Sequence, residues 1–184
     1  MNIELKILDF IQTLHIPILD KIMVWITSLG DAGMIWILLT AIFLIMPKTR
    51  RTGSIMLVAL LVQTILCNVV LKNLFARIRP YDVNTTIQLL VPKLQDFSFP
   101  SGHTSASFTI VSALYFAKDS LWKPTLVLAC LIAVSRLYLY VHYPTDVLGG
   151  IILGILSGYA GYRIIAYIAK QKQRKNHAED QRIN

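Results

Sequence analysis

Long apolar runs separated by short polar breaks dominate the chain. These runs cover residues 32–46, 53–71, 103–117, 124–140 and 147–169. Their composition is typical of membrane helices, although several are shorter than the roughly 20 residues that cross a bilayer core. We therefore predict an all-α, polytopic membrane bundle of about five transmembrane helices, in which some helix ends face a polar cavity.

The N-terminal segment has a different pattern, in which apolar and polar residues occupy opposite faces of a helix. Between residues 3 and 14 one face is apolar, whereas Glu4, Asp9 and Gln12 occupy the other. This pattern is typical of a helix that lies on a membrane surface, and it lacks the continuous apolar core of a signal peptide. We predict a single membrane domain with three parts: N-terminal interfacial helices over 1–29, a transmembrane bundle over 32–169 and a charged tail over 170–184.

Composition supports the membrane class and narrows the partners. Hydrophobic residues make up 55% and charged residues 15%, whereas about 25% of the residues in a soluble domain are charged. The net charge of +8 does not indicate nucleic-acid binding, because the basic residues lie at the ends of apolar runs. Cys67 and Cys130 have no metal-ligand spacing. We predict membrane lipids as partners, with no nucleic acid and no metal, and the sequence leaves the oligomeric state open.

The distribution of basic residues predicts which side the polar segments face. In a five-helix bundle, the ends of the second and fourth runs and the starts of the third and fifth runs share one membrane face. Of the 18 Lys and Arg residues, 7 belong to this face and 11 to the opposite one. Since cytoplasmic loops carry the excess of Lys and Arg, we predict an integral cell-membrane protein whose polar segments face out of the cytoplasm.

Three polar segments, residues 72–80, 100–103 and 135–146, meet on that face. Taken singly, each has a structural explanation, as interfacial basic residues, as a helix cap or as the start of a helix. Together they place more cations than nearby acids at one membrane depth, where charges are costly and usually functional. This excess predicts an anionic ligand.

Phosphate fits the donors that these segments offer. Arg79 and Arg136 carry planar guanidinium groups that match phosphate oxygens, and Lys72 supplies a point charge. Ser101 and the backbone N–H groups of Gly102 and His103 add donors at a helix start, where the helix dipole favours an anion. Arg77 is a candidate for a further contact with a second phosphate or a headgroup.

The same segments contain a nucleophile and an acid. No cysteine and no acidic cage for magnesium accompany them, so histidine remains as the nucleophile. If a helix already begins at His142, Asp146 lies on the same face, accepts from one ring nitrogen and leaves the other to attack phosphorus. His103 would protonate the leaving oxygen.

The segments also resemble a known family. Lys-x6-Arg-Pro, Pro-Ser-Gly-His and Ser-Arg-x5-His-x3-Asp, in this order, are similar to the three signatures of the type 2 phosphatidic acid phosphatase superfamily. That superfamily includes lipid phosphatases, glucose-6-phosphatase and the vanadium haloperoxidases. The resemblance implies a small helical bundle with its site at one membrane face. It also implies residue roles that agree with those above: Lys72, Arg79, Ser101, Gly102 and Arg136 bind phosphate, His103 is the acid, His142 is the nucleophile and Asp146 is its partner.

We therefore expect an integral membrane, metal-independent lipid phosphatase that forms a phosphohistidine intermediate and uses no cofactor. Undecaprenyl diphosphate is the favoured substrate, and phosphatidylglycerophosphate, phosphatidate and lysophosphatidate remain open. The competing class is an anion-binding transport protein, but only Gln63 and Asn68 are polar within a span, too few for a transport pathway. A haloperoxidase would share the anion pocket, and the membrane spans argue against it.

Overall fold

The structure is a computed structural model that describes the backbone of residues 3–183 and the side chains of residues 3–176. Within this part the chain is helical and contains no strand, which confirms the all-α prediction. In chain order, the elements are α1 (Ile3–Gln12), α2 (Pro17–Leu29), the 3-10 turn η1 (Asp31–Gly33), α3 (Met34–Ile45), α4 (Arg50–Thr64), the π-helical η2 (Ile65–Leu71), α5 (Lys72–Phe75), α6 (Pro80–Val83), α7 (Gly102–Phe116), α8 (Trp122–Tyr138) and α9 (Pro144–Ile183).

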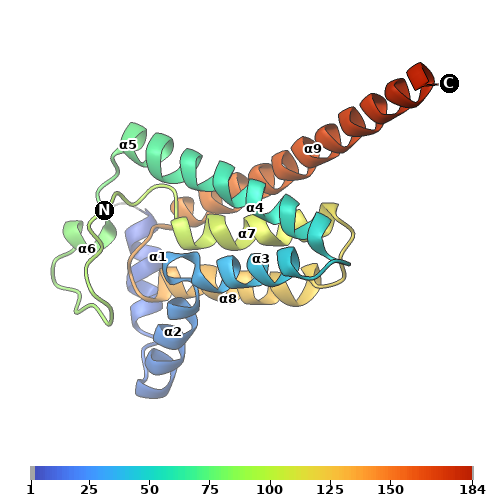
Figure 1. The fold of residues 1–184 in the computed structure, drawn as a ribbon. Helices are drawn as coiled ribbons and strands as arrows, with labels where there is room; N and C mark the ends of the chain where they lie inside the picture. The colour runs from blue at the N-terminus through green and yellow to red at the C-terminus, as the bar shows by residue number, and fades with distance from the viewer. Residues whose placement is uncertain (1–2, 184) are drawn as a thin grey trace.

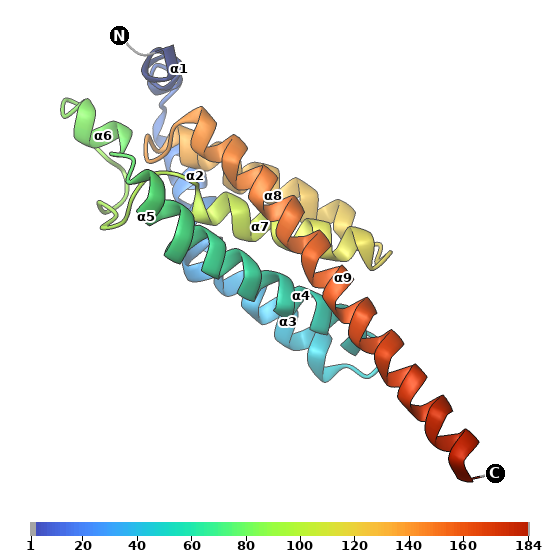
Figure 2. The same cartoon turned by 90° about the horizontal axis from the view of Figure 1, so that it is seen from above.

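Helix α7 lies at the centre of the bundle, between α3, α4, α8 and α9 (Figures 1 and 2). Residues 104–114 are all buried, and many of them are Ser, Thr or Ala, whose small side chains let neighbouring backbones come close. Helix α9 matches them with glycines at every fourth position. A Cβ at Gly154 would lie 2.6 Å from the carbonyl oxygen of Ser105, and one at Gly158 would lie 2.5 Å from the Ser112 Cβ. This contact follows α7 from Ser105, near its start, to Ser112, in its second half.

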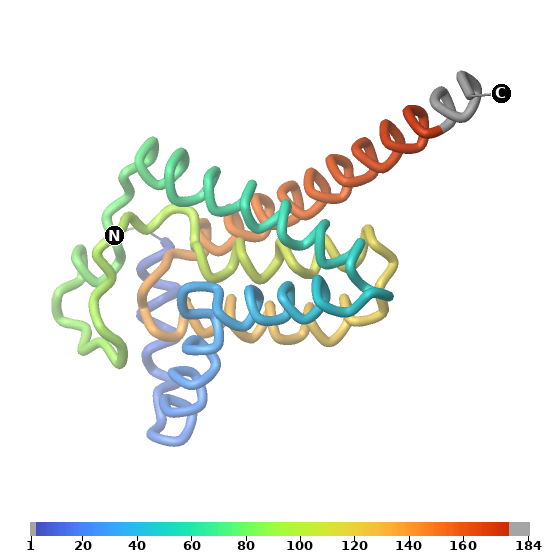
Figure 3. The backbone as a smooth tube through the Cα atoms, viewed as in Figure 1, coloured from blue at the N-terminus to red at the C-terminus, as the bar shows by residue number. Residues whose placement is uncertain are grey.

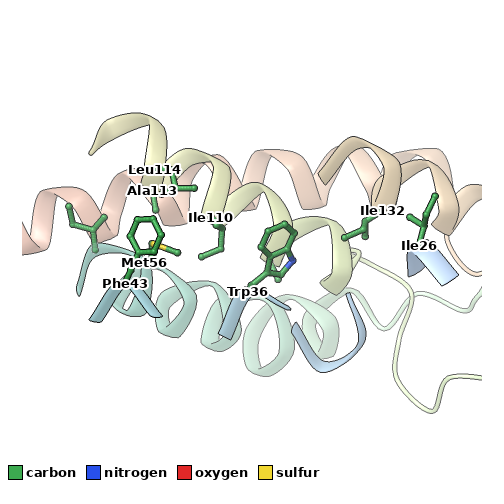
Figure 4. Close-up of a cluster of buried hydrophobic side chains, with 11 residues drawn as sticks. Ile26, Trp36, Phe43, Met56, Ile110, Ala113, Leu114 and Ile132 are labelled. Atoms are coloured by element: carbon green, nitrogen blue, oxygen red, sulfur yellow. The ribbon is translucent and has the colours of Figure 1, made fainter. Parts of the chain in front are cut away.

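An apolar cluster fills the space between α3, α4, α7 and α8, and Figure 4 shows its side chains. Trp36 is the largest of the fully buried side chains, and its indole N–H donates to Ser107 Oγ at 3.0 Å. The one polar atom of this ring is therefore satisfied, as burial requires. The cluster holds α3 and α4 against the central helix.

Within the described part of the chain, two segments are long and apolar enough to cross a membrane, Arg50–Val83 and Pro144–Asn176, and the integral-membrane prediction is confirmed at this level. The pair Pro17–Leu29 and Asp31–Ile45, bent by 41°, makes a third if it is one span; Figure 3 shows this turn of the chain between α2 and α3. Helices α7 and α8 have 15 and 17 residues and depend on the surrounding helices for their burial.

The N-terminal helix α1 lies at the end of the bundle that also carries α6, far from the C-terminal end of α9 (Figure 2). Leu8 is fully buried against the segment that follows α8, whereas Ile3, Ile7 and Phe10 are exposed. An exposed apolar face at this position fits the predicted interfacial helix.

Candidate active site

Three basic side chains that the sequence predicted to bind phosphate are buried at the same end of the bundle. Lys72 begins α5, directly after the π-helical turn η2, Arg79 precedes Pro80 at the start of α6, and Arg136 lies in the last turn of α8. Their exposed fractions are 7%, 3% and 2%. Arg136 interacts electrostatically with Arg79, so their mutual repulsion is part of the resting site. Burying like charges together is costly and indicates an anion site.

The start of α7 faces the same space. Ser101 caps the helix, and its hydroxyl accepts from the backbone N–H of Thr104 at 3.4 Å and lies 2.9 Å from the Thr104 hydroxyl. A Cβ at Gly102 would lie 3.7 Å from Lys72 Nζ, so the ammonium group and the first free N–H groups of the helix are neighbours. A helix start next to a cation is a favourable place for phosphate.

His142 lies between the cations and Asp146. Its Nε2 is 3.3 Å from Arg79 Nη1, and its Nδ1 is 3.5 Å from Asp146 Oδ2, which is an ion-pair separation rather than a well-formed hydrogen bond. Burial lowers the pKa of His142 to about 3, against the opposing effect of Asp146, so the ring is neutral in the resting protein. A neutral ring has one nitrogen with a free lone pair, as a nucleophile requires.

Helix α9 begins at Pro144, two residues after His142, so the histidine and Asp146 do not share a helical face as the spacing suggested. Instead, Asp146 is the third residue of the helix and its Oδ2 accepts from the backbone N–H of Tyr143 at 2.9 Å. This reach back to the capping residue holds the carboxylate over the turn that carries His142. The predicted pair is therefore brought together by a helix cap.

Asp146 has further partners that fix its position. Ser98 Oγ donates to Oδ2 at 2.5 Å, and Arg77 Nη1 donates to Oδ1 at 2.6 Å. Arg77 also pairs with Glu4 at 2.6 Å and lies over the Tyr143 ring, 3.9 Å from its centroid. Arg77 therefore contacts two carboxylates, and its contact with a second phosphate or a headgroup stays a prediction.

The reason for this placement is the turn after α5. Ala76 has a left-handed backbone, with a φ of 42°, and ends the short helix. The turn sends Arg77 towards α1 and the start of α9, whereas Arg79, two residues later, reaches His142.

Asp96 is an acid of the long loop, and its role in the site was not predicted. Its carboxylate pairs with Lys72 Nζ and, at 2.6 Å, with Arg79 Nη2. Partial burial opposes its ionisation, but the hydrogen bond and charge of Lys72, together with Arg79, outweigh this and lower the pKa of Asp96 to about 2. The Asp96 carboxylate is thus paired with two of the three cations that are predicted to bind phosphate.

Two other polar contacts come from the N-terminal region. Thr27, in the segment predicted to be interfacial, accepts from Arg136 Nη1 at 2.5 Å and is buried. Asp31 Oδ1 lies 2.9 Å from His103 Nε2. The only sequence signal for Asp31 was its place beside Gly30 in a helix break, and for Thr27 there was none.

A cavity of about 370 Å³ reaches this site from the side of η1 and α4. Lys72, Gly102 and His103 line its polar part, and Ile37 and Leu60 line its apolar part. His142, with 1% of its surface exposed, is not part of the lining. The predicted acid thus borders the open space, and the predicted nucleophile lies deeper.

A family model described as the PAP2 superfamily matches residues 52–170, which is more than half of the chain. The chain belongs to the PAP2 superfamily. It is 34% identical to an undecaprenyl-diphosphatase of Sulfolobus acidocaldarius over 165 residues, covering 89% of this chain and 78% of the relative. It is 36% identical to phosphatidylglycerophosphatase B of Bacillus subtilis over 152 residues, covering 76% and 72%. The crystal structure of Aquifex aeolicus LpxE is similar, with a TM-score of 0.77 and 29% identity, covering 89% of this chain and 96% of that one.

Membership of the PAP2 superfamily confirms the predicted family and the prediction of a membrane phosphatase. All three predicted segments fall within the matched residues 52–170, and so do Asp96 and Ser98. Thr27 and Asp31 lie outside these residues. Their contacts with Arg136 and His103 therefore come from a segment that the family model does not match.

Proposed function

We propose that this chain is a lipid phosphatase that hydrolyses its substrate through a phosphohistidine formed at His142. The observation that carries the proposal is the position of the His142 ring. One ring nitrogen is 3.3 Å from Arg79, in the cation cluster, and the other is 3.5 Å from the fixed carboxylate of Asp146. A base held between an orienting acid and an anion site is the arrangement that nucleophilic catalysis needs.

The reaction has two steps. His142 Nε2 attacks phosphorus, the bond from phosphorus to the leaving oxygen breaks, and that oxygen takes a proton from His103. Water then attacks the phosphohistidine, His103 takes a proton from that water, and the P–N bond breaks to release inorganic phosphate. Lys72, Arg79 and Arg136 neutralise the charge on the phosphoryl oxygens in both steps, which stabilises the transition state by fixed charge.

The proposal requires no metal, because three buried cations already supply the charge that a metal would otherwise provide. Residues 3–176 contain no group of three His, Cys, Asp or Glu side chains that could hold an ion. Asp96, Asp146 and Asp31 are instead paired with Lys, Arg or His.

A lipid substrate is supported by an apolar groove of about 340 Å³ between α3 and α4. Ile37, Leu60 and Thr64 line both this groove and the cavity at His103. The groove and the cavity are therefore adjacent, with these shared residues between the polar site and the apolar groove. An acyl or prenyl chain can therefore lie in the groove while its phosphate lies among the cations.

Undecaprenyl diphosphate is the proposed substrate, since a relative named for that activity aligns over 89% of this chain. The alternative is phosphatidylglycerophosphate, which the 36% identical relative favours. A panel of these two lipids with phosphatidate and lysophosphatidate, scored by phosphate release in detergent, separates them. We expect kcat/KM for undecaprenyl diphosphate to be highest, by about tenfold. A higher value for phosphatidylglycerophosphate would replace the proposed substrate, and no release from any lipid would contradict the lipid phosphatase.

The site is proposed to face out of the cytoplasm, on the 11 to 7 division of the basic residues. Single cysteines at Asn84, in the loop after α6, and at Asn176, near the end of α9, test this in a chain without Cys67 and Cys130. An impermeant maleimide applied to intact cells should label position 84 and spare position 176. The reverse labelling would overturn the orientation.

A further inference from the structure

The hydrogen-bond partner of His103 is an acid from outside the family-matched region. Asp31 Oδ1 lies 2.9 Å from His103 Nε2 and comes from the turn η1, 72 residues earlier in the chain. We propose that Asp31 is a positioning residue that fixes the orientation and the protonation of His103. This inference rests on the proposed function, because it is there that His103 transfers the proton.

The backbone of η1 is shaped around the histidine ring. A Cβ at Gly30 would lie 2.7 Å from His103 Cδ2, so a glycine is needed for the ring to pack at this place. Ala32, with a φ of 51°, has the left-handed conformation that side chains other than glycine rarely adopt. A surface ion pair requires neither feature, whereas strained backbone is concentrated at functional sites.

Charge gives Asp31 a second role. The charged groups that face His103 are Arg136 from α8, Lys72 from α5 and Asp31 from η1. The two cations disfavour a protonated ring, yet an acid must carry its proton when the substrate arrives. The carboxylate of Asp31 opposes burial and these two cations, and so stabilises the protonated ring relative to a chain without this acid.

The contact also decides which nitrogen acts on the substrate. Because Asp31 accepts from Nε2–H, the proton that moves is the one on Nδ1, which has no hydrogen-bond partner among residues 3–176. His103 lines the cavity, where the leaving oxygen and the attacking water must lie. Nδ1–H donates to the leaving oxygen in the first step, and Nδ1 accepts a proton from water in the second. Throughout both steps, the Nε2–H group keeps its hydrogen bond to the Asp31 carboxylate, as an orienting acid holds a catalytic histidine.

The test compares two soluble substrates whose leaving groups differ in their need for a proton. Phenyl phosphate requires protonation of its leaving oxygen, whereas p-nitrophenyl phosphate releases a stable anion. In Asp31→Asn we expect kcat/KM for phenyl phosphate to fall by about tenfold and for p-nitrophenyl phosphate by less than about threefold. The alkaline limb of the phenyl phosphate pH–rate profile should move to lower pH by about one unit. Asp31→Glu keeps the carboxylate, so it should largely retain the wild-type kcat/KM for phenyl phosphate and the wild-type position of the alkaline limb.

The matched control is Asp82→Asn, which removes a carboxylate paired with Lys93 in the loop, at 2.9 Å, and should leave both substrates unaffected. Equal losses on the two substrates with an unmoved alkaline limb would overturn the positioning role and leave Asp31 a structural one. Rates equal to wild type in Asp31→Asn would overturn it as well. The soluble substrates keep this result separate from the lipid panel, whose failure bears on the proposed function alone.

Discussion

Asp96 occupies the cations that phosphate must use, so replacing it should tighten the binding of phosphate analogues. Its carboxylate pairs with Lys72 and Arg79, and substrate or vanadate can take these partners only after displacing it. Asp96→Asn keeps the size of the side chain and removes the competing charge. We therefore expect vanadate, which mimics the transition state of phosphoryl transfer, to inhibit this variant at lower concentration than wild type.

The magnitude follows from the pKa of Asp96. A fall from 3.8 to about 2 corresponds to roughly 2.4 kcal/mol of preference for the ionised carboxylate. Because 50% of the side chain is exposed, solvent screening reduces the effective contribution to about 1 kcal/mol. Removing a competitor of that strength should lower the inhibition constant of vanadate by about fivefold.

The pH dependence has a definite sign. Since the pKa of Asp96 is depressed, the stability from its ion pairs is present above pH 3.8 and is lost as the pH falls towards 2. Between about pH 5 and 8 the carboxylate stays ionised, so the fivefold effect should not change over that range.

The assay measures inhibition of p-nitrophenyl phosphate hydrolysis by vanadate in detergent, with Asp82→Asn as the matched control. A vanadate affinity that is unchanged or weaker in Asp96→Asn would refute the competition and indicate that Asp96 supports the anion site.

Three further predictions concern the surroundings of the site. Arg77→Met should lower kcat by about tenfold with little change in KM, because Arg77 acts through Asp146; a change in KM alone would favour the phosphate contact that the sequence suggested. Gly154→Leu should cost about 1–3 kcal/mol and lower the melting temperature in detergent, since its Cβ would meet backbone atoms of α7; the exposed change Ile152→Leu is its control, and equal melting temperatures would contradict the packing. Activity should persist in excess chelator, and a loss that magnesium restores would contradict the metal-independent mechanism.

The sequence predicted site residues where the residue type and its spacing along the chain indicated the same chemistry. The predicted phosphate binders and the two histidines were identified because costly charged residues stood out against apolar runs. Their association in space also followed from counting which helix ends share a face. The glycines of α9 recur at every fourth position, a pattern typical of close helix contacts, so the packing against α7 also has a signal in the sequence.

The remaining site contacts depend on tertiary packing. Asp31 and His103 are 72 residues apart in the sequence, and Thr27 and Arg136 are 109 apart. No local sequence pattern predicts contacts between residues so far apart in the chain. Asp96 was visible as a nearby acid, but its ion pairs depend on how a long loop folds back. Composition also cannot show that the turn at Ala76 directs Arg77 to Asp146 while Arg79 reaches His142.

The central claim is that His142 carries the phosphoryl group, and trapping that group tests it most directly. Wild-type protein mixed with undecaprenyl diphosphate labelled at its terminal phosphorus, then quenched in alkali within one turnover, should hold label in an acid-labile, alkali-stable form. Peptide mapping should place the label on His142, and His142→Ala should take up none while hydrolysis falls by several orders of magnitude. Label on another residue, or a His142→Ala variant that keeps more than about a tenth of the wild-type rate, would contradict the account.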